Sequence, residues 1–173
     1  METGLGYAKI PRRLKQLFNS LMSNSKMKIS TNYIHVDTKQ APEFIDITDK
    51  VSGFVTGAGI NNGVAIVYSM HTTCAIRINE NEPLLLEDMG DFLSRMAPRD
   101  ADYRHNDFSI RTVNMNDDEC PNGHAHCQHL SLGTSESVPI VDGKLKMGRW
   151  QSIFLVELDM PRPRDVIVQI IGE

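Results

Sequence analysis

The residues most able to do chemistry in this chain are its histidines, and three of the six fall within one ten-residue stretch. This stretch, residues 120–129, reads CPNGHAHCQH. Two more histidines, His71 and His105, each lie beside polar residues. Neutral imidazole is the commonest protein ligand for zinc and the side chain that most readily moves protons near neutral pH. The pattern predicts a metal-assisted or acid–base site built from these histidines.

The cysteines and histidines allow two kinds of metal site. An open catalytic site needs three protein ligands and a water, and three separate segments would supply them through His71, His105 and one histidine of the 120–129 stretch. A closed structural zinc site would instead use two cysteines and two histidines of the short stretch: Cys120, His124, Cys127 and His129. Their short spacing is not that of a usual zinc finger and strains a tetrahedron. We therefore expect the open set, with zinc or magnesium as the divalent metal.

Glu80 is the carboxylate that we expect in the site. It alternates with Glu82 in the sequence Asn79-Glu80-Asn81-Glu82, just before Pro83. Paired carboxylates can divide acid and base roles when their surroundings separate their pKa values. Acids at the start of a helix also stabilise it through the helix dipole, which is the structural alternative for both residues. We expect Glu80 and His126 to be the catalytic residues.

Arg149 and Trp150 are the expected substrate contacts in the C-terminal half. The forked donors of arginine match phosphate or carboxylate groups, and the single tryptophan of the chain can stack on a substrate ring. The alternative is that Trp150 packs at the edge of a strand. The sequence contains no glycine-rich phosphate loop, nucleophile elbow or dinucleotide-binding fingerprint. A phosphorylated small molecule would therefore depend on individual side chains such as Arg149.

The apolar patterns that must position these residues predict about eight strands and two or three helices. The expected strands are 26–36, 44–47, 64–69, 75–78, 138–141, 144–147, 153–158 and 166–171. The expected helices are 48–55, 83–96 and 123–132, the first of them capped by Thr48 or Asp49. Asp142-Gly143 is a strong signal for a hairpin turn. Because strands and helices do not alternate regularly, we expect an α+β fold. It is a mainly antiparallel sheet or sandwich with two or three helices on one side.

Length and composition indicate one globular domain. The chain has 173 residues, of which 40% are hydrophobic, and no apolar run approaches the ~20 residues of a membrane span. The net charge is −4, and the positive charge is concentrated before residue 36, so the acidic body argues against nucleic-acid binding. Three cysteines, an odd count, indicate free thiols in a reducing compartment. We expect a cytoplasmic protein without a membrane or nucleic-acid partner.

Residues 1–25 form a basic N-terminal extension that differs from the expected domain over residues 26–173. Six apolar residues follow helical spacing, which predicts an amphipathic helix: Ile10, Leu14, Leu17, Phe18, Leu21 and Met22. One interpretation is a helix that packs on the domain or frays. The other is a presequence for mitochondria or another organelle, because such segments are amphipathic, contain arginine and are poor in acids.

Several short motifs of this chain together resemble the YjbQ-like family, whose members are also called secondary thiamine-phosphate synthases. The motifs fall in the family's order: His71-Thr72-Thr73, Asn79-Glu80-Asn81, Tyr103-Arg104-His105, His126 with Leu132-Gly133, Pro139, Asp142-Gly143, Gly148-x-Trp150-Gln151 and Gly172-Glu173. The resemblance runs from about Lys26 to the C-terminus. His124, His129, Cys120 and Cys127 are not general features of the family.

The resemblance implies a compact β-rich domain that assembles as a homotrimer. It also implies a weak or secondary ability to join the pyrimidine pyrophosphate and thiazole phosphate halves of thiamine, with metal at the histidine site in some members. His71, His105 and His126 are the shared histidines, and Asn79 joins Arg149 and Trp150 as an expected substrate contact. Two other functions stay open: a metal-dependent hydrolase of a small substrate, and a non-catalytic trimeric binding protein.

Overall fold

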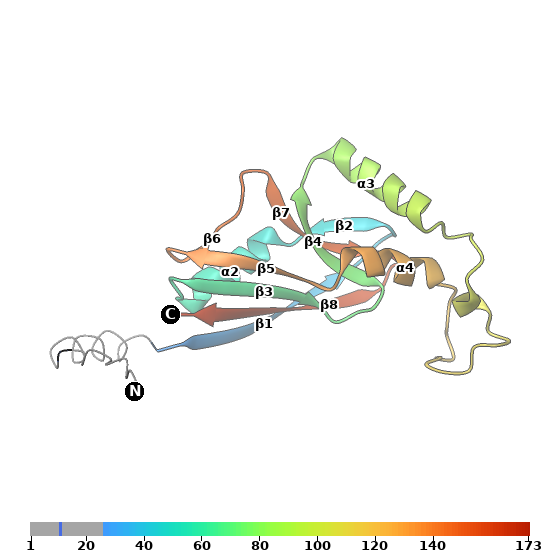
Figure 1. Ribbon diagram of the computed structural model, residues 1–173, viewed down its shortest axis with the longest axis horizontal. Coiled ribbons are helices and arrows are strands. Elements are labelled where there is room, and N and C mark those ends of the chain that lie inside the picture. Colours follow the sequence, from blue (N-terminus) through green and yellow to red (C-terminus); the bar gives the residue numbers. More distant parts are fainter. Residues whose placement is uncertain (1–10, 12–25) are drawn as a thin grey trace, which may run out of the picture.

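The computed structural model describes residue 11 and residues 26–173 (Figure 1). In chain order its elements are β1 (Lys28–Asp37), β2 (Glu43–Asp46), α2 (Thr48–Ala58), β3 (Gly63–Ser69), β4 (Cys74–Glu80), α3 (Pro83–Met96), the 3-10 helix η1 (Arg104–Asn106), α4 (Gly123–Leu132), β5 (Ser135–Val141), β6 (Lys144–Leu145), β7 (Gln151–Glu157) and β8 (Pro163–Gly172). The amphipathic helix expected within residues 1–25 lies outside the described residues. None of the described helices is long and apolar enough to cross a membrane.

The strands form two antiparallel sheets. One has five strands in the order β1-β8-β3-β5-β6, and the other has three in the order β2-β7-β4. In the larger sheet, the ten-residue strands β1 and β8 pair along their whole length, from Lys28 opposite Gly172 to Asp37 opposite Pro163. In the smaller sheet, β7 is central, and its register with β4 runs from Glu80 opposite Gln151 to Cys74 opposite Glu157. The predicted α+β, mainly antiparallel architecture is confirmed.

Two apolar cores hold the layers together. The larger core lies between the sheets, where inward residues such as Val67 and Val168 meet Leu155 of β7, and α2 adds Val51 and Val55. The smaller core lies on the other face of β2-β7-β4, where helices α3 and α4 cover it. Its buried members include Phe154 and Ala75 from the sheet, Leu93 from α3 and Ala125 from α4. The smaller sheet is therefore covered on both faces.

The larger sheet has an outer face on which no described helix packs. Directly opposed residues of antiparallel strands share a face, so the register defines two apolar rows across this surface. The first row is Ile29, Ile171, Val64 and Pro139, and the second is Tyr33, Ile167 and Tyr68, with a row of Thr31, Gln169, Ile66 and Ser137 between them. Ile29 and Tyr33 are 65% and 54% exposed. We call this surface the outer sheet face.

The helix boundaries follow the sequence signals closely, with one difference. Helix α3 starts at Pro83 as predicted, and the carboxylate of Glu82 accepts the backbone N–H groups of Leu84 and Leu85. The sequence also predicted Thr48 or Asp49 as the cap of α2, and this is wrong. The cap position is Ile47, whose side chain makes no capping bond. The Thr48 hydroxyl instead accepts the Ile153 N–H at 2.8 Å, which ties α2 to β7.

Candidate functional site

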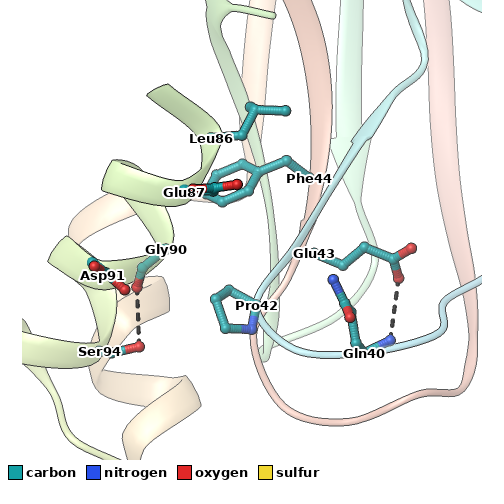
Figure 2. Close-up of a pocket in the computed structure, with 9 residues that line it drawn as sticks. All are labelled: Gln40, Pro42, Glu43, Phe44, Leu86, Glu87, Gly90, Asp91 and Ser94. Carbon is teal, nitrogen blue, oxygen red and sulfur yellow. Dashed lines mark hydrogen bonds between the residues drawn. The ribbon is translucent and has the colours of Figure 1, made fainter. Parts of the chain in front are cut away.

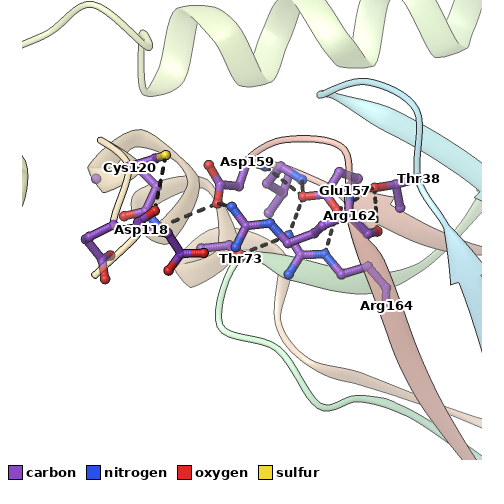
Figure 3. A network of polar contacts seen from close by, with 12 residues as sticks. Thr38, Thr73, Asp118, Cys120, Glu157, Asp159, Arg162 and Arg164 are labelled. Atoms are coloured by element: carbon purple, nitrogen blue, oxygen red, sulfur yellow. Dashed lines mark hydrogen bonds and ion pairs between the residues drawn. The ribbon is translucent and has the colours of Figure 1, made fainter. Parts of the chain in front are cut away.

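A buried ion pair fixes the chain where β7 ends. Glu157 is 0% exposed and Arg164 is 3% exposed, and the guanidinium donates through Nε and Nη2 to both carboxylate oxygens (Figure 3). The Glu157 carboxylate also accepts the backbone N–H groups of Leu158 at 3.1 Å and Asp159 at 2.9 Å. A buried charge needs this many partners. The result is a rigid base from which Asp159 projects.

His71 is fixed to β8 rather than free to bind a ligand through its Nε2 atom. This nitrogen accepts the backbone N–H of Asp165 at 2.8 Å, so in the neutral ring the proton lies on Nδ1. Burial, helped by the positive charge of Arg164, lowers the pKa of His71. The ring is therefore neutral near pH 7 and holds the loop between β3 and β4 against the start of β8.

His105 and His126 are the two expected site histidines that do meet. Their rings contact edge to face, with centroids 4.7 Å apart and planes at 71°. His105 lies in η1, and His126 lies in the first turn of α4. Burial lowers the pKa of His126, and the neighbouring His105 lowers it further, while Asp159 acts in the opposite direction. His126 is therefore a neutral imidazole near pH 7, which is the form that can accept a proton.

The start of α4 is held against η1 by an asparagine. The side-chain oxygen Oδ1 of Asn106 accepts the backbone N–H groups of Asn122 at 3.0 Å and Gly123 at 2.8 Å. The first N–H groups of a helix have no partner within the helix, so this side chain satisfies two of them. The same contact brings the two segments that carry His105 and His126 together.

Buried polar atoms without a hydrogen-bond partner gather around α4. Five such side-chain atoms occur in the described part of the chain: His105 Nε2, Asn122 Oδ1, His124 Nδ1, His129 Nε2 and Asp159 Oδ1. Asn122 Nδ2 and Asp159 Oδ2 are 3.5 Å apart, so two of these residues are direct neighbours. Buried polar groups in proteins are almost always paired with protein, water or ligand. Their concentration marks this region as the candidate functional site.

A cavity of about 440 Å³ opens beside these residues. It is lined by Asn116, Asp118, Glu119, Cys120, Asn122, Met160, Pro161 and Arg162. The Arg162 side chain is 38% exposed, and its guanidinium donates to the buried Asp159 carboxylate at 2.7 Å. Figure 3 shows Asp159 and Arg162 between the buried Glu157–Arg164 pair and the loop that carries Asp118 and Cys120. The cavity is therefore lined by charged side chains, and one of them, Arg162, is held by the buried Asp159 carboxylate.

The other expected site residues lie at the opposite end of the smaller sheet. Glu80 is opposite Gln151 in the β4–β7 register, whereas Cys74 is opposite Glu157, six residues away. At ~3.3 Å per residue this separation is roughly 20 Å. Asn79 and Trp150 are next to this far end, where Arg149 stacks on the Trp150 ring at 4.5 Å and Asn79 Nδ2 contacts Met89 Sδ. Within one chain, these residues are not brought together with His105 and His126.

A larger cavity of about 600 Å³ lies between β2 and α3 (Figure 2). Its lining combines acidic and apolar side chains: Gln40, Pro42, Glu43, Phe44, Leu86, Glu87, Gly90, Asp91 and Ser94. Glu43 already accepts the N–H of Lys39 at 2.6 Å, and the lining includes no histidine, cysteine or arginine. The lining has carboxylates but contains none of the buried, unpartnered polar atoms that gather around α4, so we place the candidate site at α4 and not here.

The residues of one chain do not form the metal site expected from sequence. No group of three His, Cys, Asp or Glu side chains within residues 26–173 is arranged to hold a metal ion. His105 and His126 meet, but His71 Nε2 is engaged by the Asp165 amide. The closed set of Cys120, His124, Cys127 and His129 is not assembled either. We therefore derive no chemical step through a metal.

With this geometry established, the comparisons with known proteins decide the family. The family described as "UPF0047 protein YjbQ-like" matches residues 32–173 of this chain. The chain belongs to the YjbQ/UPF0047 family. A UPF0047 protein of Methanothermobacter thermautotrophicus is 40% identical over 147 residues, which are 85% of this chain and 95% of the relative. YugU of Bacillus subtilis, another UPF0047 protein, is 32% identical over 80% of this chain and 97% of its own.

Solved structures confirm the YjbQ-like fold. A YbjQ-like protein of unknown function from Sulfolobus solfataricus is 38% identical with a TM-score of 0.77, and the match covers 86% of this chain and all of that one. A hypothetical protein from Aeropyrum pernix is 34% identical with a TM-score of 0.74, over 83% of this chain and 99% of its own. These relatives support the family and the fold, and their names state no reaction.

Sequence reasoning missed three residues of this candidate site: Asn122, Asp159 and Arg162. Asn122 lies within the histidine-rich stretch without being singled out there, and Asp159 and Arg162 belong to no motif, because the three meet only where β7, the turn after it and the start of α4 converge. Residues 116–119, an acidic run within a long polar segment, were the available signal. This run supplies Asn116, Asp118 and Glu119 to the lining of the cavity, but Met160–Arg162, which line the same cavity, are far away in the sequence.

Proposed function

We propose that this chain is a small enzyme that transfers protons on a phosphorylated substrate, with His126 and His105 as the working pair. The single observation that carries the proposal is the contact between these two imidazoles beside the partnerless Asp159 Oδ1 atom. A neutral His126 can accept a proton, and an adjacent imidazole can pass it on. The site lies next to the open cavity that contains the Arg162 guanidinium.

The specific reaction that we propose is of the secondary thiamine-phosphate synthase type. Weakly or as a side activity, the nitrogen of a thiazole phosphate forms a bond to the methylene carbon of a pyrimidine pyrophosphate while the bond from that carbon to pyrophosphate breaks. His126 accepts a proton from the pyrimidine amino group as pyrophosphate leaves and returns it to the product. The negative charge on the departing pyrophosphate must be balanced, and forked arginine donors suit that role. The support for this reaction is the resemblance of the motifs together with the charged cavity at the histidine pair. The reaction could also use the residues at the far end of the smaller sheet only if a second chain brought them near His105 and His126. These residues are Glu80, Asn79, Arg149 and Trp150.

The test is incubation of the purified full chain with both thiamine precursors, with thiamine phosphate measured as product. We expect product with the wild type and at least a tenfold loss with His126→Ala, since a positioned acid–base group contributes about 10²–10⁴-fold. Lys50→Ala is the control, because Lys50 is exposed on α2, away from both histidines and from the outer sheet face. Equal rates for His126→Ala and the wild type would contradict the proposal.

The same assay separates the other two functions. Turnover of generic phosphate esters by the metal-loaded protein, without reaction of the thiamine halves, would favour a metal-dependent hydrolase. Tight ligand binding with no turnover would favour a non-catalytic binding protein. A divalent metal, zinc or magnesium, stays a prediction, supported by the contact of two of its three expected ligands. Elemental analysis of the wild type and of His71→Ala, His105→Ala and His126→Ala tests it.

We also propose that the chain assembles as a homotrimer through the outer sheet face. Monomeric proteins rarely expose large apolar surfaces, and the two apolar rows of this face, with the mixed row of Thr31, Gln169, Ile66 and Ser137 between them, cross several strands of the larger sheet. Light scattering measures the mass of the particle in solution. We expect a trimer for the wild type and smaller particles for Tyr33→Asp, whereas Lys144→Asp at the β5–β6 turn should not change the mass. A monomeric wild type would contradict this proposal.

A further inference from the structure

A second cavity, whose lining is basic where that of the cavity beside Asn122 includes carboxylates, adjoins the same histidine pair. It measures about 410 Å³ and is lined by Arg104, His105, Ile110, Arg111, Val113 and Asn114. This lining has two guanidinium groups and an imidazole but no carboxylate, and we call it the basic cavity. The cavity beside Asn122 instead has Asp118 and Glu119 in its lining with Arg162, and we call it the acidic cavity.

An ion pair links the two cavities. Arg111 of the basic cavity donates through Nη1 to Glu119 Oε1 of the acidic cavity at 3.1 Å, and both side chains are largely buried. Arg111 Nη2 also donates to the backbone oxygen of Asn114 at 2.6 Å. A guanidinium carries five N–H donors, so further donors of Arg111 remain for a ligand. Glu119 holds the Arg111 fork in place and partly offsets its charge.

The other groups of the basic cavity have donors to spare. Arg104 is exposed and forms no ion pair with the described part of the chain. The Nε2 atom of His105 is buried and has no hydrogen-bond partner. Ile110 and Val113 are 53% and 69% exposed, which gives the cavity an apolar side as well. This set of groups can donate to an anion and also contact an apolar body.

We propose that the basic cavity binds the phosphate group of the substrate, through Arg104, Arg111 and the Nε2 atom of His105. Arginine matches phosphate because its parallel N–H donors contact two oxygens at once. The ligand class is a phosphate monoester or diphosphate whose organic part rests on Ile110 and Val113. The inference rests on the proposed function for the identity of the substrate, but phosphate binding can be measured without turnover. The phosphate contact is then not Arg149, at the far end of the smaller sheet, which the sequence had predicted. It is made by residues next to His126.

The test is a titration of the isotope-labelled full chain with inorganic phosphate and then pyrophosphate, followed by amide NMR at constant ionic strength. We expect shifts concentrated at residues 104–114 and smaller changes at Met160–Arg162. Arg104→Gln should weaken phosphate binding at least about tenfold, which is the effect of losing one charge-assisted hydrogen bond. Arg95→Gln, at the end of α3, is the matched control for removing a positive charge.

A second variant distinguishes a direct role in phosphate binding from a loss of binding caused by a disturbed fold. Glu119→Gln removes the carboxylate that offsets the charge of Arg111, so phosphate should bind several-fold more tightly. Loss of structure would weaken binding instead. Unchanged phosphate affinity in Arg104→Gln, or a loss confined to Arg149→Gln, would overturn the proposal. Turnover of the thiamine precursors could still depend on His126 in that case, so this inference and the proposed function fail in distinguishable ways.

Discussion

Glu157 and Arg164 form a two-pronged ion pair that is closed off from solvent at the point where the chain leaves β7 and returns as β8. Two threonine hydroxyls also contact the pair. Thr73 Oγ1 accepts from Arg164 Nη2 at 3.1 Å, and Thr38 Oγ1 lies 3.1 Å from Glu157 Oε2. The ion pair thus ties together β1, β4, β7 and β8 next to the candidate site.

Breaking this ion pair from one side should be strongly destabilising. Glu157→Gln leaves the Arg164 charge buried without its counter-charge, and such losses are about 3–5 kcal/mol. The double variant Glu157→Leu with Arg164→Met removes both charges and should unfold at a higher urea concentration than either single variant. Urea unfolding followed by circular dichroism measures the wild type, Glu157→Leu, Arg164→Met and the double variant, with Glu157→Gln as a further single variant. Additive losses in the double variant would show that the two charges are not coupled.

Gly63 allows β3 and β8 to approach more closely than any side chain permits. A Cβ atom at this position would lie 2.1 Å from the backbone oxygen of Ile171. We therefore expect Gly63→Ala to cost about 1–3 kcal/mol or more, since the strands must separate. Gly53→Ala is the matched control in α2, where an added Cβ meets nothing within 4 Å. That variant should gain about 0.5–1 kcal/mol in thermal or urea unfolding.

The sequence predicted local structure well because the local signals were strong. Pro83 and Gly133 bound their helices, and Asp142-Gly143 forms the β5–β6 turn with positive φ angles of 52° and 72°. The cap of α2 was missed because Thr48 uses its hydroxyl for a tertiary contact with β7. Contacts of that kind depend on the packing of distant segments, which a single sequence does not display.

The candidate site was predicted only in part, for the same reason. The meeting of His105 and His126 could be predicted from sequence because each lies in a polar, histidine-containing motif. The separation of Glu80 and Arg149 from them follows from the register of β4 on β7, which no motif encodes. Asp159 is fully buried, and its backbone N–H donates to the carboxylate of the buried Glu157. Its importance appears only when the strands are assembled.

The three cysteines should divide into two reactive thiols and one inert thiol. Burial raises the pKa of Cys74 to about 12, and the nearby Glu157 carboxylate adds to the effect, while Cys120 and Cys127 are exposed. The thiolate is the reactive form, so Cys74 should not react in the folded chain. We expect a chromogenic disulfide reagent to titrate two thiols rapidly in buffer and three in denaturant. Rapid reaction of three thiols in buffer would contradict the buried position of Cys74.

Removing the cap of α3 should cost a moderate amount of stability. Glu82 accepts two backbone N–H groups, from Leu84 at 3.1 Å and Leu85 at 2.8 Å. Glu82→Ala leaves both without this acceptor, and comparable caps contribute about 0.5–2 kcal/mol. Asp88→Ala, at an exposed position of the same helix, is the control and should change the midpoint of unfolding little. Equal midpoints for the two variants would show that the cap contributes nothing measurable.

Acid should destabilise the fold through histidines that are held neutral. Burial is the main cause that lowers the pKa of four of them, namely His71, His124, His126 and His129. Each binds a proton more readily in the unfolded chain, where its pKa is near 6.5. The stabilisation is therefore complete above about pH 6.5 and is lost as the pH falls toward the lower pKa of the folded state.

The free energy of unfolding should accordingly fall between pH 6.5 and pH 5, by at most about 1.4 kcal/mol per pH unit for each proton taken up. Urea unfolding at pH 7.5, 6.5 and 5.5 measures this dependence. Carboxylates act in a lower pH window. Burial raises the pKa of Asp46, but hydrogen bonds from Thr48, Ser152 and Asn81 together outweigh it, and the pKa is lowered. His124→Gln removes the most deeply buried of the four imidazoles and should flatten the slope. A stability that stays constant from pH 7.5 to 5.5 would show that these rings are accessible to protons in the folded chain, contrary to their burial.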